Sequence, residues 1–208
     1  MMLPRELFEK MLSFYGPQNW WPGEGFEIAI GAILTQNTSW KNVEKAIENL
    51  REQNLLTPRG ILDCDSDMLL KMITPAGFYN QKARYLKNIS RLMISNSKPS
   101  RQALLSVKGV GEETADSILL YLFKEAEFVI DAYTIRISKR LGFGASDNRN
   151  YWKSFYESSL NKEVSLFNEF HALFVEHGKR FCKKEKPQCT NCFLAIDCEF
   201  GKKESNRG

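Results

Sequence analysis

The chain has 208 residues with a formal net charge of +4; hydrophobic residues make up 43% and charged residues 26%. This balance is typical of a folded globular protein and excludes an intrinsically disordered chain. No apolar run reaches the roughly 18 residues that a membrane-spanning helix needs, and the start, MMLPRELFEK, lacks the apolar core of a signal peptide. We therefore expect a cytoplasmic protein with no membrane partner.

Helical periodicity runs through most of the chain. Residues 26–34 are apolar nearly all round, which is typical of a buried helix, and residues 43–50 carry an apolar stripe on one side. The segment TIRISKRLGFG ends at Gly142 and Gly144, a common way to stop a helix. Since alternating strand patterns are missing, we predict an all-α fold of about nine or ten helices. The tail over residues 201–208 is predicted to be disordered.

Three of the four tryptophans, Trp20, Trp21 and Trp40, lie close together in the sequence. Two interpretations remain open for this group. The rings pack into a core with one of them exposed, or they form an aromatic pocket for a planar ligand.

The stretch SVKGVGEETADSILLYLF places Gly109, Val110 and Gly111 between a short helix and a longer one. This arrangement is a helix–hairpin–helix. Glycines permit the tight turn and remove side chains that would hold a phosphate away, while the following helix offers free N–H groups and the positive end of its dipole. We predict contacts from Gly109 and Gly111 to DNA phosphates, which position DNA without reading its sequence. Taken alone, such a turn is not specific for DNA.

Asp131 follows an apolar approach in EFVIDAYTIRISKR and opens a helix. An aspartate at this place is commonly an N-cap. The alternative is a buried carboxylate at the mouth of a cleft, beside the hairpin. The residues by themselves leave both interpretations open.

Four of the five cysteines, Cys182, Cys189, Cys192 and Cys198, follow a C-x6-C-x2-C-x5-C spacing. Zinc sites usually pair two short C-x2-C knuckles across a longer gap. A compact loop with four thiols suits a cube-shaped cluster, so we favour [4Fe–4S], with zinc or a fortuitous grouping as alternatives. Cys64 stands alone and is most simply structural.

Five basic residues, Lys179, Arg180, Lys183, Lys184 and Lys186, crowd around the first of these cysteines. Such a run is compatible with a solvated loop or with a patch that faces phosphate.

The glycine turn, Asp131 after an apolar stretch and the cysteine spacing together resemble the endonuclease III superfamily of DNA glycosylases, which are base-excision enzymes. The segment ILTQNTSW is similar to the family segment whose glutamine fills the gap left by a flipped base, here Gln36. The segment AGFYNQKA is similar to the one that supplies an apolar wedge, here Phe78. The resemblance implies a [4Fe–4S] cofactor held by the four cysteines, with Lys183 and Lys184 turned to phosphate.

One departure from the family pattern concerns strand cleavage. Bifunctional relatives have a lysine at the position of Glu113, and that lysine forms a Schiff base with the sugar. Lys108 lies on the other side of the turn, where relatives often have proline, and does not match the position. The resemblance therefore implies a monofunctional glycosylase that removes the base and leaves an abasic site.

The combination of WWP with LTQNT is similar to the endonuclease III-like 3-methyladenine DNA glycosylases. By this resemblance Trp20, Trp21 and Trp40 would stack on the damaged base. An N-alkylated purine is cationic, so indole rings attract it, and it leaves as a neutral base without needing a strong general acid. The two histidines, His171 and His177, lie far along the chain from these motifs, and the sequence gives them no role.

In this scheme the nucleotide is first flipped out of the duplex. Asp131 would stabilise the oxocarbenium-like sugar and orient or deprotonate the attacking water, by analogy with glycoside hydrolysis. A mismatch thymine or uracil glycosylase is the rival specificity. A non-catalytic DNA-binding protein of the same fold is the rival from another class.

The resemblance also implies two helical lobes with DNA across the cleft between them. Residues 23–130 would form one lobe, and residues 1–22 with 131–208 the other. The expected partner is double-stranded DNA containing a damaged base, bound by a monomer. In the cytoplasm the protein would associate with the nucleoid when on DNA.

Overall fold

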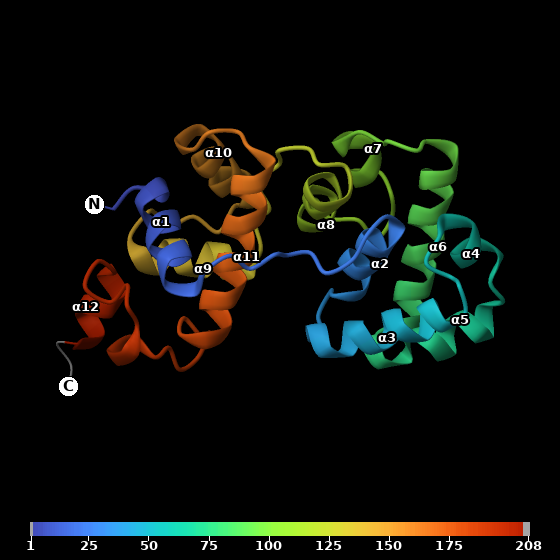
Figure 1. Ribbon diagram of the computed structural model, residues 1–208, viewed down its shortest axis with the longest axis horizontal. Coiled ribbons are helices and arrows are strands. Elements are labelled where there is room, and N and C mark those ends of the chain that lie inside the picture. The colour runs from blue at the N-terminus through green and yellow to red at the C-terminus, as the bar shows by residue number, and fades with distance from the viewer. Residues whose placement is uncertain (1, 206–208) are drawn as a thin grey trace. The chain divides into compact units, whose positions relative to one another are not determined.

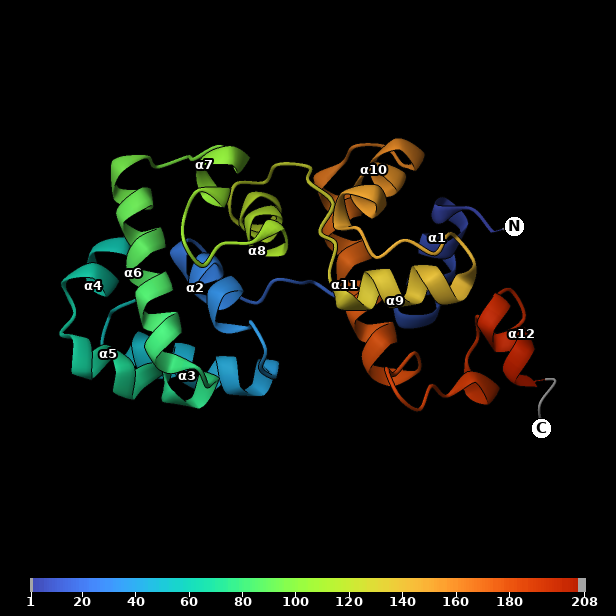
Figure 2. The same ribbon diagram turned by 180° about the vertical axis from the view of Figure 1, so that it is seen from behind.

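The computed structural model describes residues 2–205. The chain forms two compact units. The first, Trp21–Glu125, is called the hairpin unit below. The second combines the residues up to Trp20 with those from Ala126 onward and is called the cysteine unit. Regular structure within residues 2–205 is helical, with no strand (Figures 1 and 2), and this confirms the predicted fold class.

The boundaries of the units differ slightly from the expected lobes. Trp21 and Pro22 belong to the hairpin unit, whereas residues 126–130 belong to the cysteine unit. The reason for the second difference is packing, because the Phe128 ring stacks on Tyr156 with centroids 4.6 Å apart.

The hairpin unit is built around helix α2 (Phe26–Leu34). Residues 28–34 are all buried, which explains why this helix carries apolar side chains on every face. Helix α3 (Trp40–Glu52) buries only one stripe, as its one-sided pattern predicts. The other helices before the hairpin are α4 (Pro58–Asp63), α5 (Ser66–Ile73), the 3-10 turn η1 (Thr74–Ala76) and α6 (Tyr79–Ser95).

The predicted helix–hairpin–helix is present. Helix α7 (Arg101–Leu105) starts at the N-cap Ser100, whose hydroxyl accepts a hydrogen bond from the Ala103 amide at 3.2 Å. After the glycine turn, α8 (Glu112–Ser117) runs directly into the π-helix η2 (Ile118–Leu122). Both helices pack on α2, so the hairpin is fixed to the buried centre of its unit.

The cysteine unit has a core rich in aromatic rings. Phe170 and Phe174 stack with centroids 4.6 Å apart, and Phe8 meets Phe170 edge to face at 5.4 Å. Helix α11 (Val164–Arg180) therefore lies beside the N-terminal helix α1 (Pro4–Tyr15) (Figure 1). The helices of this unit are α1 (Pro4–Tyr15), α9 (Ala132–Leu141), α10 (Arg149–Ser159), α11 (Val164–Arg180), the 3-10 turn η3 (Cys189–Asn191) and α12 (Glu199–Ser205).

The tail prediction was wrong up to Ser205. Helix α12 covers Glu199–Ser205 and packs on α9; residues 206–208 lie outside the described part. Gly201 is buried so tightly that a Cβ would come within 2.9 Å of the Ala195 carbonyl oxygen. Long-range packing thus orders a segment that looks polar and unstructured in the sequence.

The structure holds twelve α-helices within residues 2–205, more than the nine or ten predicted. The additional ones are short, such as α4 and α7, and span too few residues to show a clear apolar period. The predicted stop at Gly142 is confirmed, since α9 ends at Leu141 and Gly142 is left-handed with φ 94°. Of the helices described, none is both long and apolar enough to cross a membrane.

Candidate functional site

Glycine stands at positions 109 and 111 of the hairpin for two different structural reasons. Gly109 is left-handed with φ 105°, and a Cβ there would lie 2.1 Å from the Tyr85 ring. Gly111 is the N-cap of α8 with φ −93° and ψ 179°, and a Cβ there would meet nothing within 4 Å. Gly109 is therefore required by the fold, whereas Gly111 keeps the space in front of the α8 N-terminus open.

Gln36 lies against the hairpin. Its side-chain amide nitrogen donates to the Gly109 carbonyl at 3.0 Å and to the Thr114 hydroxyl at 3.1 Å. The segment that resembles the gap-filling region is thus held in contact with the turn that resembles the phosphate-binding region.

Phe78 has two features that are unusual for an aromatic residue. Its side chain is 65% exposed, and its backbone is left-handed at φ 47° and ψ 31°, at the N-cap of α6. A bulky residue with positive φ is strained, and such strain is commonly found at functional sites. Packing in the fold does not account for an exposed ring held in this way.

The structure groups two of the three predicted tryptophans. Trp21 meets Trp40 edge to face with centroids 5.0 Å apart, and Trp21 also faces Tyr121 at 5.3 Å. Trp21 lies so close to α2 that a Cβ on Gly31 would come within 2.6 Å of its ring. Both are half-buried against the core of the hairpin unit, whereas Trp20 belongs to the cysteine unit.

Tyr121 was missed by the sequence analysis. It lies in η2, where the Phe123 amide donates to the Ile118 carbonyl five residues earlier at 3.2 Å, as in a π-helix. The sequence pattern predicts a regular α-helix over this segment, and such a helix does not indicate that the ring lies beside Trp21.

Asp131 is both the N-cap of α9 and a buried carboxylate, 6% exposed. Its Oδ1 accepts hydrogen bonds from the Thr134 amide at 2.7 Å and the Thr134 hydroxyl at 2.8 Å. Its Oδ2 lies 3.6 Å from Nε2 of His171. The N-cap interpretation is thus confirmed, and the carboxylate is buried within the cysteine unit.

The environment of Asp131 favours its ionised form. Burial by itself raises the pKa of the carboxyl, but the neighbouring His171 ring and the two hydrogen bonds from Thr134 outweigh it. The net pKa lies below the usual 3.8, so Asp131 is a carboxylate at neutral pH.

His171 is a second residue that sequence reasoning missed. Forty positions separate it from Asp131, and it lies on a helix whose other buried side chains are mostly aromatic, including Phe167, Phe170 and Phe174. Its ionisable ring on that apolar face was the available signal. Distance along the chain does not separate His171 from Asp131, because α11 packs on α9.

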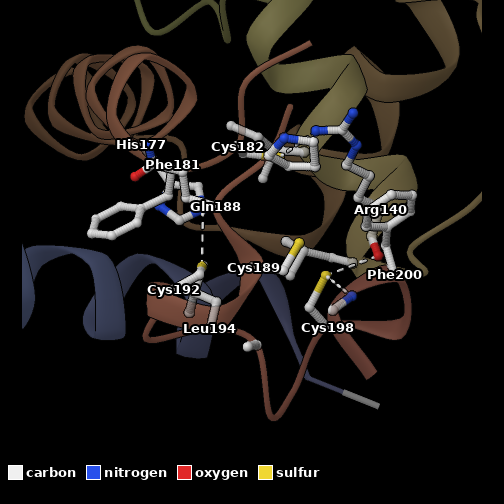
Figure 3. A pocket seen from close by; sticks show the side chains of 15 residues that line it. Arg140, His177, Phe181, Cys182, Gln188, Cys189, Cys192, Leu194, Cys198 and Phe200 are labelled. Carbon is white, nitrogen blue, oxygen red and sulfur yellow. Dashed lines mark hydrogen bonds between the residues drawn. The ribbon is translucent and has the colours of Figure 1, made fainter. Parts of the chain in front are cut away.

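The four cysteines of the spaced motif, Cys182, Cys189, Cys192 and Cys198, line a single cavity (Figure 3). Ends of α9, α11 and α12 form its walls. No set of three His, Cys, Asp or Glu side chains within residues 2–205 converges as a single ion requires. In a four-iron cube each thiolate binds a different iron, so that convergence is not needed.

The thiols are in an environment that disfavours their charged form. Burial raises the pKa of Cys192 to about 11, and burial followed by the nearby cysteines raises those of Cys189 and Cys198 as well. Thiolates at such positions need a cationic group to balance their charge. The four thiols around one cavity are the donor set that an iron–sulfur cluster uses.

Protein groups also surround the sulfurs. Arg140 Nη1 donates to Cys182 Sγ at 3.2 Å, and the Gly201 amide donates to Cys198 Sγ at 3.4 Å. His177, which the sequence analysis also left without a role, lies with Nε2 3.8 Å from Cys192 Sγ. Outer contacts of this type orient metal ligands and tune the group that they hold.

The basic loop after Cys182 is tied down through its backbone. Arg140 donates to the carbonyl oxygens of Lys183 at 2.7 Å and Lys184 at 2.9 Å. Both lysine residues are exposed. Their carbonyl groups are thus fixed, and their side chains face solvent.

Comparison with known proteins defines the class. The chain belongs to the HhH-GPD superfamily of base excision DNA repair proteins, whose family model matches residues 30–157. Membership of the endonuclease III superfamily, as the motifs indicated, is thereby confirmed.

Individual relatives fit this assignment. A Methanocaldococcus jannaschii protein, named provisionally as a DNA repair glycosylase, is 46% identical over 93% of this chain and 94% of its own. The 3-methyladenine DNA glycosylase MagIII of H. pylori, solved with 1,N6-ethenoadenine, has a TM-score of 0.79 at 27% identity, covering 86% and 98% of the chains. Endonuclease III in a non-covalent DNA complex has a TM-score of 0.86 at 25% identity, covering 97% and 96%.

Replacing each hairpin glycine by alanine is expected to have different effects, because Gly109 is required by its conformation and packing whereas Gly111 is not. Gly109→Ala should lower the free energy of unfolding by more than about 1 kcal/mol, because it combines a positive φ with a clash against Tyr85. Gly111→Ala should cost less than Gly109→Ala, because its φ of −93° suits any residue and a Cβ there meets nothing within 4 Å. Urea unfolding measures both, and equal losses would contradict this account.

Asp131→Asn is expected to alter acid stability. Since the folded-state pKa of Asp131 is lowered, the ionised carboxylate contributes stability that is present above its unfolded pKa and is lost as pH falls through the folded one. Asparagine keeps the helix cap but does not titrate. Urea unfolding at several pH values should therefore show a difference between wild type and variant that shrinks in acid; a constant difference would contradict it.

Proposed function

We propose that the protein is a monofunctional DNA glycosylase that removes an alkylated purine, such as 3-methyladenine, from double-stranded DNA. The observation that carries this proposal is the buried carboxylate of Asp131, ionised and held between Thr134 and His171. A helix cap alone could be made by an uncharged residue such as asparagine, so the buried charge is what favours an enzyme over a scaffold that only binds DNA.

The hairpin unit supplies the DNA contacts in this proposal. The open space before Gly111 admits a phosphate to the N-terminus of α8. The exposed ring of Phe78 acts as the wedge between bases, and Gln36 fills the gap left by the flipped nucleotide. In support, the side chain of Gln36 contacts the hairpin at Gly109, and Phe78 is exposed despite its size.

Asp131 supplies the chemistry. As the glycosidic bond breaks, the sugar gains oxocarbenium character, and a nearby carboxylate stabilises that charge. The same carboxylate orients or deprotonates the attacking water. His171 and Thr134 keep it ionised and fix its orientation, since both of its oxygens have a partner.

Glu113 supports hydrolysis without strand cleavage. It lies in the first turn of α8, where the bifunctional relatives carry the Schiff-base lysine. A carboxylate cannot form that imine. We infer that the product is an intact strand with an abasic site.

The choice of substrate rests on the aromatic group. Trp21 and Trp40 pack edge to face and remain half-buried rather than lost in the core. Electron-rich indole rings favour a cationic purine over a neutral pyrimidine. MagIII, at 27% identity, is one structural neighbour that acts on 3-methyladenine, alongside endonuclease III at 25%.

We further propose that the four cysteines hold a [4Fe–4S] cluster. The shared cavity and the donors around the sulfurs support it. When bound, the cluster would hold the cysteine loop in place and would take no part in base removal. Arg140 would then hold Lys183 and Lys184 with their side chains free to meet DNA phosphates.

A panel of damaged duplexes tests the function. We expect release of 3-methyladenine, little release of thymine or uracil from mismatches, and no covalent complex trapped by borohydride. Trp40→Ala should slow release by about tenfold to a hundredfold, because stacking contributes roughly 1–3 kcal/mol per base.

Trp40→Phe is the matched control, since it keeps an aromatic ring at the same place and should retain most of the activity. Circular dichroism and urea unfolding establish that each variant is folded. Release of mismatched pyrimidines alone would replace the proposed substrate with the rival one. Full activity in folded Trp40→Ala would contradict stacking of the Trp40 ring on the damaged base.

The cofactor has its own prediction. Protein purified without oxygen should be brown and contain about four irons per chain. Cys192→Ser should lose iron, because the residue lines the cavity. Cys64→Ser should keep it, because Cys64 is in the hairpin unit and its thiol contacts the Asp65 carbonyl. A colourless protein with one zinc would contradict the proposal.

A further inference from the structure

Lys82 is a buried lysine that the proposed chemistry does not use. It lies in the first turns of α6 and is only 2% exposed. Its ammonium group donates to the Leu34 carbonyl at 2.8 Å and to the Ala76 carbonyl at 2.8 Å. One side chain thus joins the ends of two elements that lie far apart in the sequence.

Both acceptors end a helical element. Leu34 is the last residue of α2, and Ala76 is the last residue of η1. Carbonyl groups at such ends lack an intrahelical partner and carry the negative end of the helix dipole. A cation satisfies them better than a neutral donor, and this offsets part of the cost of burying the ammonium group.

The burial of Lys82 has a measurable cost. Desolvation lowers the pKa of Lys82 to about 8. The fold retains the lysine although an apolar residue of similar length would avoid that penalty. A role in holding the two carbonyl groups explains its presence better than core packing does.

Each acceptor precedes, by the same number of positions in the sequence, one of the two residues proposed to enter DNA. Gln36 follows Leu34 by two positions, and Phe78 follows Ala76 by two positions. Helix α6 itself begins at the Phe78 cap. Further along the same helix, Asn88 donates to the Lys108 carbonyl at 3.1 Å, at the start of the glycine turn.

We propose that Lys82 is a positioning residue that locks the Gln36 segment and the Phe78 turn in register, so that both side chains enter a damaged duplex as one rigid pair. This inference rests on the proposed function, because it assumes that both residues insert at the site of a flipped base. Lys82 touches neither DNA nor the reacting atoms in this role.

The test compares two lysines of the same helix. Lys82→Met removes the ammonium group and keeps the length of the side chain. Lys87→Met is the matched control, because Lys87 also donates to a carbonyl, that of Cys64 at 3.0 Å, but to a segment without a proposed DNA contact. For each variant, urea unfolding measures stability. Fluorescence anisotropy measures the affinity for an abasic-analogue duplex and for an undamaged duplex of the same sequence.

The quantity of interest is the preference for the abasic duplex. In folded Lys82→Met, the ratio of affinity for the abasic duplex to affinity for undamaged DNA should fall about tenfold, equivalent to ~1.4 kcal/mol. Its affinity for undamaged DNA should stay within about twofold of wild type. Lys87→Met should keep the preference. An unchanged preference in folded Lys82→Met overturns the proposal, and so does an equal loss of affinity for both duplexes, which indicates a structural role only.

A second measurement applies if Lys82→Met does not fold. Gln36→Ala, Phe78→Ala and the double variant form a cycle in a chain that keeps Lys82. Insertion as a rigid pair predicts that the losses of abasic preference are coupled by about tenfold, whereas additive losses contradict it. If wild type itself shows no preference for the abasic duplex and releases no base, the proposed function fails, and this outcome is distinct from failure of Lys82 alone.

Discussion

The contact between the Asp131 carboxylate and its two supporting residues is the constraint on which the proposed chemistry depends. Asp131 begins α9, and α11 brings His171 to it at 3.6 Å. The same two helices reach the cysteine cavity at their other ends, where Arg140 of α9 contacts Cys182 and His177 of α11 lies near Cys192. Two rigid helices therefore connect the proposed catalytic group with the proposed cluster loop, and loss of order in that loop would disturb the register that keeps Asp131 ionised.

Local chemistry made part of this structure predictable. The Gly-x-Gly turn between helical patterns, the aspartate at a helix start and the short cysteine spacing are all determined by neighbouring residues. A left-handed Gly109 and an N-capping Asp131 follow from backbone preferences that act over a few positions. The cysteines share a cavity because only a short loop separates them.

The parts that could not be predicted depend on contacts between distant segments. His171 reaches Asp131 only because α11 packs on α9, and Tyr121 reaches Trp21 because a π-helical turn interrupts the regular period. Lys82 looks like an ordinary surface lysine until the ends of α2 and η1 meet its ammonium group. The order of α12 likewise comes from packing on α9, since its own residues are mostly polar.

The most direct test of the account is base release by Asp131→Asn. Asparagine keeps the cap of α9 and nearly the same volume but lacks the negative charge that stabilises the sugar. The account predicts that single-turnover release of 3-methyladenine falls by about a hundredfold or more, while affinity for an abasic-analogue duplex stays close to that of wild type. Release at the wild-type rate by the folded variant would contradict the central role of Asp131.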